Sequence, residues 1–250
     1  MPYNVLETQA EPSMSTEYTN PLFTVDSVLF TVENEQLLVL LVKRAQAPFI
    51  GYWGLPGGFI DTIQDQNTDA TARRKLQAKT GLNPGYLEQL QVISGPARDP
   101  RGFSVTLAYF ALVAYQAVSP QITSVESASW VNYKELPSLE LAFDHLHIIE
   151  AARLRLQQKT LYSMTPVFCL PTQFTIAQLK SVIETIIEKP VQRKSLMRRV
   201  EASNIFDISE EKTPSGGRMA QLYRLKPGAD YVNFERNLSC STVRDVDINT

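Results

Sequence analysis

A glycine-rich loop followed at once by a polar helix is the feature that most limits how this chain can fold. The loop is WGLPGGFI, and the segment after it, Asp69–Lys79, is predicted as a helix closed by Gly81. Apolar runs surround this pair. TVDSVLFTV and QLLVLLVKR, separated by ENE, predict a hairpin, and LEQLQVISG, FSVTLAYFALVAY and ESASWVNYKEL predict further strands. Residues 139–158 repeat apolar side chains at helical spacing: Leu141, Leu146, Ile149, Ala152 and Leu156. We therefore expect a mixed β-sheet flanked by helices, ending near residue 160.

A second unit is predicted beyond residue 165. TIAQLKSVIETIIEK carries a one-sided apolar stripe and ends at Pro190, which indicates an amphipathic helix. VQRKSLMRRVEASN is predicted as a second helix, with Val191, Leu196 or Met197, and Val200 facing inward. FDISEE and MAQLYRL, joined by the Gly- and Ser-rich KTPSGGR, predict a hairpin.

Charge is distributed unevenly between these units. The 250 residues are 44% hydrophobic, enough for two domains, and the net charge is −2. Residues 189–226 hold nine Lys and Arg against four Asp and Glu, whereas residues 1–188 hold 13 against 18. A basic segment on an acidic chain indicates a part that binds a polyanion, although a merely solvated surface gives the same count.

The remaining sequence features exclude several classes of protein. Cys169 and Cys240 lack metal-ligand spacing and suggest no disulfide framework. No apolar run approaches 18 residues, so we expect no membrane contact. Residues 1–20 lack the basic start and apolar stretch of a signal peptide and are predicted to be a flexible leader. These features favour a cytoplasmic protein.

GLPGGFID followed by ARRKLQAKTGL resembles the Nudix box, in which helical glutamates hold Mg²⁺ or Mn²⁺ against a pyrophosphate. Arg74, Leu76 and the closing Thr80-Gly81-Leu82 match the motif. The acid positions do not, because they hold Lys75, Ala78 and Lys79, and Gln66 replaces the preceding glutamate. Amines repel a divalent cation, so we expect no enzyme activity and no metal. The alternatives are an ordinary turn and surface helix, or a displaced metal site on Asp61, Asp65, Asp69 or Glu88.

A cleft of this shape still offers backbone donors and basic groups to a nucleotide. We predict that the effector is bound by these residues: Arg44, Gly57, Gly58, Phe59, Lys75, Lys79, Arg98 and Arg101. Arg98 and Arg101 could clamp a pyrophosphate or belong to a surface turn capped by Asp99. Phe49, Tyr52 and Trp53 could stack on a base or lie in the core. His145 and His147 are two residues apart, which favours helix packing over metal binding.

The order of the second unit, helix, basic helix and glycine-turned hairpin, is that of a winged helix-turn-helix. We predict that DNA is contacted by these residues: Gln192, Arg193, Lys194, Ser195, Arg198, Arg199, Lys212, Thr213, Ser215 and Arg218. Gly216 and Gly217 could bring backbone amides near a phosphate. The alternative is a small appendage that aids dimerisation.

The whole ordered chain resembles the NrtR family, the Nudix-related transcriptional regulators of NAD metabolism. The resemblance implies an α+β chain with a flexible leader (1–20), a Nudix-type α/β/α sandwich (21–160) and a C-terminal winged helix domain (165–240). It also implies a homodimeric repressor of NAD biosynthesis or salvage genes. Such a repressor binds a palindromic double-stranded operator, needs no cofactor, and senses ADP-ribose or a related metabolite. Two other hypotheses are an active pyrophosphatase with a displaced metal site, and a module that binds a nucleotide and a protein partner without DNA.

Overall fold

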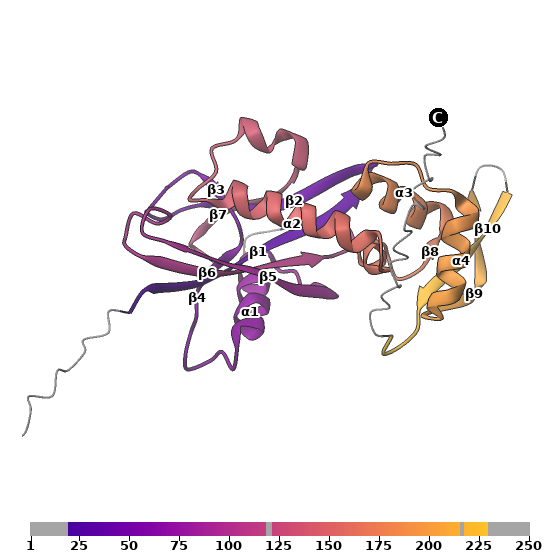
Figure 1. The fold of residues 1–250 in the computed structure, drawn as a ribbon, viewed down its shortest axis with the longest axis horizontal. Helices are drawn as coiled ribbons and strands as arrows, with labels where there is room; N and C mark the ends of the chain where they lie inside the picture. Colours follow the sequence, from indigo (N-terminus) through magenta and orange to yellow (C-terminus); the bar gives the residue numbers. More distant parts are fainter. Residues whose placement is uncertain (1–19, 119–121, 216–217, 230–250) are drawn as a thin grey trace, which may run out of the picture.

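The computed structural model describes residues 20–118, 122–215 and 218–229, which form two units arranged along the long axis of the molecule (Figure 1). The predicted leader, apart from Asn20, and Cys240 lie outside the described residues. No helix among the described residues is both long and apolar enough to cross a membrane.

The first unit is built on a seven-stranded mixed sheet. Its strands are β1 (Leu22–Glu33), β2 (Gln36–Arg44), β3 (Trp53–Gly54), β4 (Gly57–Phe59), β5 (Tyr86–Gly95), β6 (Ser104–Leu112) and β7 (Val125–Asn132). The order is β3-β2-β1-β6-β5, with β4 paired to β1 and β7 paired to β2. β1 and β6 are parallel, and the other pairs are antiparallel. Asn34 and Glu35, with φ of 49° and 59°, make the predicted hairpin turn between β1 and β2.

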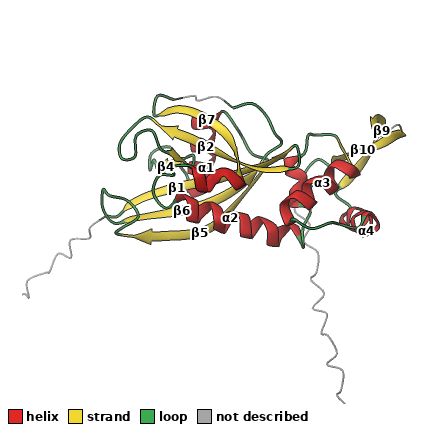
Figure 2. Cartoon of the chain, turned by 90° about the horizontal axis from the view of Figure 1, so that it is seen from above, coloured by secondary structure: helices red, strands yellow, loops and turns green. Residues whose placement is uncertain are grey.

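Helices α1 (Thr68–Thr80) and α2 (His145–Thr160) lie on opposite faces of this sheet (Figure 2). Alternate residues of β1 point to the two faces. Leu29 packs with Leu76 of α1, and Val28 packs with Ile148 of α2. The predicted first helix and its closing Gly81, which takes φ of 76°, are confirmed, and the structure adds an N-cap: the Asn67 side chain accepts a hydrogen bond from the amide of Ala70.

The second helix starts later than its apolar spacing predicts. Residues 133–138 form a short 3₁₀ helix, η1 (Tyr133–Ser138), and α2 begins only at His145. Leu141 instead makes an isolated bridge to Trp53, whose amide donates to Glu140 O. Phe143 has φ of 55°, which no α-helix contains. The prediction of helix from residue 139 was therefore wrong, because Glu140 and Leu141 pair with Trp53 of β3 instead of forming helical hydrogen bonds.

The second unit has the predicted winged-helix order. It contains η2 (Thr165–Cys169), β8 (Phe174–Thr175), α3 (Ile176–Ile187), α4 (Arg193–Ser203), β9 (Phe206–Ser215) and β10 (Arg218–Leu225). A capping box on Thr175 and Gln178 starts α3. Leu179 and Ile183 of α3 form a core with Leu196 and Val200 of α4. β9 and β10 pair as the wing, and β8 completes a three-stranded sheet.

The two units share an apolar junction. Val182 and Ile186 of α3 belong to the same buried cluster as Phe110 of the sheet and Leu156 of α2. Cys169 is buried there too, and burial raises the pKa of its thiol to about 12. This cysteine is therefore a core residue, consistent with the absence of metal-ligand spacing.

Candidate effector cleft and nucleic-acid interface

The glycine loop places its backbone against the central strand. Gly57 and Gly58 belong to β4, which pairs with Val25 and Asp26 of β1. A Cβ on Gly57 would stand 2.1 Å from an Asp26 carboxylate oxygen, so no other residue fits. Gly58 has φ of 148°, and the Lys75 ammonium lies 3.4 Å from the position of its absent Cβ. The structure thus brings Gly57, Gly58 and Lys75 together, as predicted for one site.

Arg44 and Lys75 lie near Lys79, and the nearest acids are Asp26 for Lys79 and Arg44, and Asp61 and Asp65 for Lys75. The pKa of Lys79 falls to about 8, first because of burial and then through the positive charges of Arg44 and Lys75, which Asp26 opposes. Burial is also the main reason that the pKa of Lys75 is lowered. Asp26, at 8% exposure, accepts a hydrogen bond from the Thr106 hydroxyl at 2.7 Å. Sequence reasoning missed Asp26 because it lies inside an apolar strand.

This set of donors does not fit Mg²⁺ or Mn²⁺. A hard cation needs several oxygen ligands, whereas the helix presents two ammonium groups and the Ala78 methyl group. The other acids named above are engaged. Asp65 accepts two bonds of 2.6 Å from Arg74, and Asp69 accepts one of 2.6 Å from the Tyr109 hydroxyl. Among residues 20–118, 122–215 and 218–229, no three His, Cys, Asp or Glu side chains gather as a metal site.

Glu88 and Asp61 also have other roles. Glu88 pairs with Arg155 at 2.6 Å and with Lys159. These two ion pairs join β5 to α2. Asp61 accepts from the amides of Ile63 and Gln64 and so shapes the loop before α1. Glu88 therefore serves β5 and α2, whereas Asp61 and Asp65 share the loop before α1.

Arg44 and Arg101 lie over aromatic rings near the glycine loop. The Arg44 guanidinium lies 4.9 Å from the centre of the Phe143 ring, and Arg101 lies 5.2 Å from that of Phe59. Burial lowers the pKa of Arg44, and the charge of Arg101 lowers it further. Arg101 is tied to Asp99 by bonds of 3.0 and 2.7 Å, yet its side chain stays 39% exposed. Arg101 therefore belongs to the predicted Asp99-capped turn, with its guanidinium over the Phe59 ring.

Arg98 is tied to Asp144. Its guanidinium makes two bonds to the Asp144 carboxylate, at 2.9 and 2.8 Å, and one to the Ser104 hydroxyl at 3.0 Å. Its side chain is 9% exposed. Arg98 and Arg101 thus do not act as one clamp, because the first is used to hold the start of α2.

The aromatic residues of the loop divide between the cleft and the core. Phe49 meets Phe143 edge to face at 4.8 Å, and both have positive φ (62° and 55°). Together with Arg98, Asp99 and residues around them, they line a cavity of about 370 Å³. Tyr52 packs edge-on against Phe49, whereas Trp53 packs against the sheet core. Phe143 was missed by sequence reasoning, since its contacts with Phe49 and Arg44 join residues that are distant in the sequence.

His145 is a packing residue. Its Nδ1 accepts a hydrogen bond of 2.9 Å from the amide of Leu55, and burial is the largest reason that its pKa is lowered. His147 is exposed on the next turn. The prediction that helix packing explains this pair is consistent with His145.

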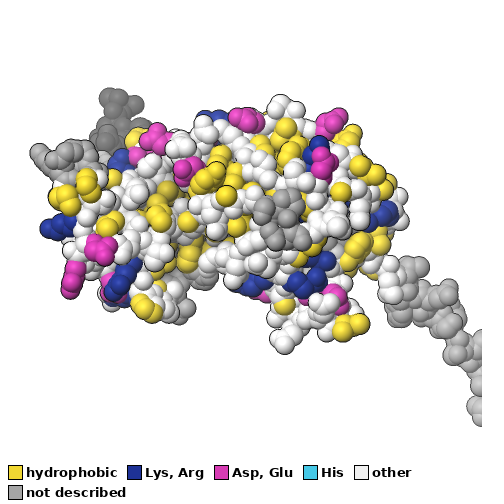
Figure 3. Space-filling model, turned by 180° about the vertical axis from the view of Figure 1, so that it is seen from behind, with side chains coloured by type: hydrophobic (Ala, Val, Ile, Leu, Met, Phe, Trp, Pro, Cys, Tyr) yellow, Lys and Arg dark blue, Asp and Glu magenta, His cyan; other side chains and the backbone are white. Residues whose placement is uncertain are grey.

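Five of the six DNA-binding residues predicted on or beside the second helix of the winged unit are exposed to solvent. Gln192, Arg193, Lys194, Ser195 and Arg198 are exposed, while Leu196 and Val200 are buried. On the wing, Lys212 is exposed and Thr213 is half-buried. The side chains of Ser215 and Arg218 and the whole of Gly216 and Gly217 lie outside the described part of the chain. Figure 3 shows basic side chains standing beside acidic ones at both ends of the molecule.

Arg199 does not share the exposed face of α4. Its guanidinium donates to the carbonyl oxygens of Thr160 at 3.1 Å and Leu161 at 2.8 Å. These atoms lie at the C-terminal end of α2, in the other unit. Burial lowers the pKa of Arg199. The predicted DNA contact by Arg199 is therefore corrected to a contact between the two units.

Fold and site together define a Nudix domain joined to a winged helix, with cations in place of the Nudix acids. Residues 22–152 match the NUDIX domain family, and residues 166–225 match the NrtR DNA-binding winged helix domain family. The chain belongs to the NrtR family.

Two relatives place the chain more closely. It is 41% identical over 222 residues to the ADPR responsive transcriptional repressor NtrR of Acinetobacter baylyi, covering 89% of each chain. The crystal structure of Shewanella oneidensis NrtR with a 27mer DNA superimposes with a TM-score of 0.80 at 48% identity, covering 87% of this chain and 99% of that one. The NUDIX domain of the same Shewanella protein, crystallised with ADP ribose, superimposes with a TM-score of 0.55 at 50% identity. This match covers 56% of this chain and 90% of that one.

Proposed function

We propose that this chain is an ADP-ribose-responsive transcriptional repressor that acts on genes of NAD biosynthesis or salvage. It binds a palindromic operator as a homodimer and carries no pyrophosphatase activity. One observation carries the proposal: Lys75 and Lys79 stand where a Nudix hydrolase needs glutamates, in a chain that also has a winged helix. The cleft therefore holds its ligand without cutting it.

Cations and rings in the cleft suit a dinucleotide pyrophosphate. Lys75 and Lys79 neutralise phosphate oxygens where metal ions serve a hydrolase, and Arg101 adds a half-exposed guanidinium. Phe49 and Phe143 offer apolar walls for a base or ribose beside the 370 Å³ cavity. ADP-ribose combines these features, and it is the ligand with which the Shewanella oneidensis domain was crystallised.

The recognition surface of the winged unit is the exposed face of α4. Gln192, Arg193, Lys194, Ser195 and Arg198 reach base edges and phosphates in a major groove. The wing adds Lys212, Thr213, Ser215 and Arg218 to the flanking backbone. Arg199 is left out of this surface because it contacts α2.

The ligand acts through differential affinity. A dimer places two recognition helices at a fixed spacing, so a small rotation of either one mismatches the two half-sites. ADP-ribose shifts the population of dimers toward the mismatched arrangement because it binds that arrangement more tightly than the operator-binding one. The size of the shift is set by the ratio of the two affinities.

Operator binding with and without ligand tests the proposal. A duplex of 27 base pairs, the length in the Shewanella complex, is first selected from a random library with the wild-type protein. Its Kd is then measured by fluorescence anisotropy from zero to millimolar ADP-ribose. We expect the Kd to change by about 5- to 150-fold at saturation. Arg198→Ala weakens binding and lowers the salt dependence by about one ion per monomer. A Kd that stays constant over the ADP-ribose range removes the sensing claim, and light scattering that gives a monomer removes the dimer.

The absence of hydrolysis is measured separately. Wild-type protein is incubated with ADP-ribose and millimolar Mg²⁺ or Mn²⁺, and AMP is followed by chromatography. We expect no AMP above the protein-free blank. Turnover that disappears with Asp61→Ala would instead identify an active pyrophosphatase with a displaced metal site.

A further inference from the structure

Helix α2 reaches from the effector cleft to the recognition helix. It is a single helix of 16 residues, about 24 Å long, that runs along the sheet toward α3 and α4 (Figure 1). A continuous helix moves as one stiff body, so a displacement at one end arrives at the other.

The first turn of α2 is fastened to the cleft at two points. Arg98 holds the Asp144 carboxylate just before the helix, at 2.9 and 2.8 Å. His145 accepts from the amide of Leu55, two residues before Gly57. The His145 ring also lies 3.0 Å from where a Cβ on Gly54 would stand, so loop and helix are in close contact. Any shift of the glycine loop therefore pushes on the start of α2.

The Arg199 side chain fastens the far end of α2 to α4. The last carbonyl oxygens of a helix lack helical partners and carry partial negative charge. Arg199 donates to two of the oxygens at this end, those of Thr160 and Leu161. Because Arg199 follows the buried Leu196 by three residues, its side chain lies on the flank of α4 that faces the first unit.

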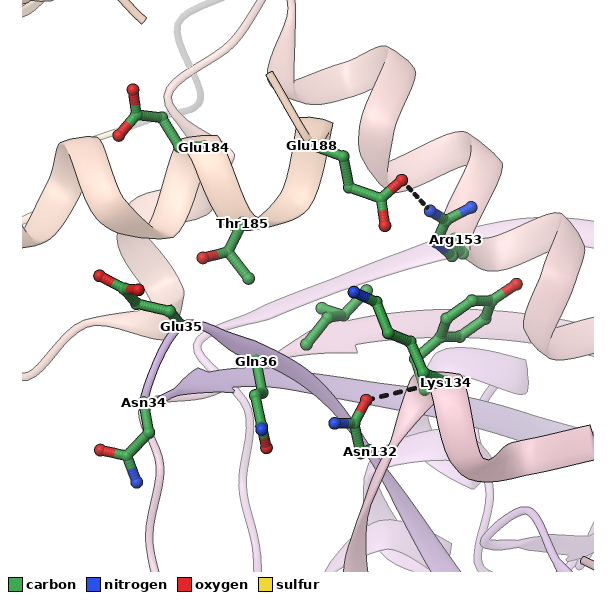
Figure 4. Close-up of a pocket in the computed structure, with 11 residues that line it drawn as sticks. Asn34, Glu35, Gln36, Asn132, Lys134, Arg153, Glu184, Thr185 and Glu188 are labelled. Atoms are coloured by element: carbon green, nitrogen blue, oxygen red, sulfur yellow. Dashed lines mark hydrogen bonds and ion pairs between the residues drawn. The ribbon is translucent and has the colours of Figure 1, made fainter. Parts of the chain in front are cut away.

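Between these ends, α2 contacts the end of α3 through polar groups. Arg153 pairs with Glu188 at 2.7 Å, and the Gln157 side chain donates to Ile186 O at 3.0 Å. Figure 4 shows the Arg153–Glu188 pair at the edge of a cavity of about 520 Å³ between α3, the β1–β2 turn and α2. This cavity leaves the winged unit room to shift against the sheet on that side.

We propose that Arg199 is the positioning residue that converts occupancy of the effector cleft into movement of the recognition helix, through α2. The inference rests on the proposed function. A displacement of the glycine loop moves Asp144 and His145 at the start of α2. The whole helix moves with them, and the two Arg199 hydrogen bonds transmit this movement to α4.

The test compares Arg199→Ala and Arg199→Lys with Arg198→Ala, an exposed neighbour on the same helix. For each protein the operator Kd is measured at zero and at saturating ADP-ribose, and the ratio of the two is the coupling factor. Calorimetry gives the ADP-ribose Kd of the free protein. Circular dichroism melts establish that each variant is folded.

We expect Arg199→Ala to keep the ADP-ribose Kd of the free protein within about twofold of wild type, because the side chain is remote from the cleft. Its coupling factor should fall to a third or less of the wild-type value, which lies between about 5 and 150. Arg199→Lys should keep part of the coupling factor, since its ammonium group reaches one of the two carbonyl oxygens to which the arginine donates. Arg198→Ala weakens operator binding equally with and without ligand and leaves the factor unchanged.

Other results decide against the inference. A wild-type coupling factor in Arg199→Ala refutes it, as does a loss of the factor in Arg198→Ala of the same size. If Arg199→Ala does not fold, the lysine variant decides, and a full wild-type factor there overturns the assignment. A wild-type protein that binds operator without responding to ADP-ribose refutes the proposed function itself.

Discussion

Replacing Lys79 by methionine should stabilise the ligand-free protein and lower its affinity for ADP-ribose. Lys79 is half-buried near Arg44 and Lys75, and desolvation of its ammonium group is the largest reason that its pKa falls from 10.5 to about 8. Methionine has nearly the same length and no charge to desolvate. Binding sites for charged ligands commonly hold such unfavourable groups at the expense of stability.

The magnitude follows from the pKa. One pKa unit corresponds to about 1.4 kcal/mol, so a fall from 10.5 to about 8 corresponds to about 3 kcal/mol at pH 7. Asp26 loses one of its cationic neighbours in the variant, which offsets part of the gain. We expect a net stabilisation of about 1–2 kcal/mol. The pKa of Lys79 is lower in the folded state than in the unfolded state. Above pH 10.5 the lysine is neutral in both states and does not destabilise the fold, whereas below pH 8 it is charged in both states and the full destabilisation is present. The difference between variant and wild type is therefore constant below pH 8 and narrows from pH 8 to 10.5.

Urea denaturation at pH 7.0, 8.5 and 10 measures this difference, and calorimetry measures ADP-ribose affinity. Gln77→Met is the matched control, because it places the same side chain at an exposed position of α1 and should change stability by less than about 0.5 kcal/mol. We expect the ADP-ribose Kd of Lys79→Met to rise roughly tenfold or more, from the loss of a charge-assisted hydrogen bond. A variant less stable than wild type at pH 7, or a difference that does not change by pH 10, would refute the reasoning.

Three further substitutions test the framework around the sites. Asp144→Asn removes the charged partner of the buried Arg98 and should cost about 1–3 kcal/mol in urea denaturation; a cost under about 0.5 kcal/mol would show the pair to be dispensable. Leu179→Ala, at a fully buried position in the winged unit, should cost about 2–5 kcal/mol in the same assay, and a smaller loss would mean that this core repacks. Gly57→Ala puts a methyl group 2.1 Å from an Asp26 oxygen, so ADP-ribose binding measured by calorimetry should be lost; wild-type affinity would contradict the loop geometry.

The sequence predicted those features whose causes are local. The predicted helix, Asp69–Lys79 closed by Gly81, differs from α1 by one residue at each end, because helix ends depend on nearby side chains. The exposed face of α4 followed from the spacing of Leu196 and Val200. Strand pairing of Leu141 with Trp53 has no local signal, so the start of α2 was misplaced.

The partners of the arginines could not be predicted in the same way. Arg98 pairs with Asp144, 46 residues away, and Arg199 with carbonyl oxygens 38 and 39 residues away. A run of basic residues shows that charge is present but does not distinguish an arginine facing water from one facing the end of another helix. The spacing of Arg199 from Leu196 was the available signal, since it places Arg199 beside the buried face.

The retained arginine of the motif shows why the loop and helix outlast the chemistry. Arg74 makes two bonds of 2.6 Å to Asp65, and this pairing holds the pKa of that carboxyl well below its usual range. Asp65 also accepts from the amide of Asp61 and from the Thr71 hydroxyl, so one carboxylate ties the loop to the first turns of α1. None of these bonds involves the positions of Lys75, Ala78 or Lys79. The groups that shape the loop are therefore different side chains from those at the acid positions of the motif, even though Thr71 and Lys75, and Arg74 and Ala78, share a helix face. Exchanging the acids for amines leaves the bonds that shape the loop in place, so a binding site can keep the fold of a hydrolase without its metal ligands.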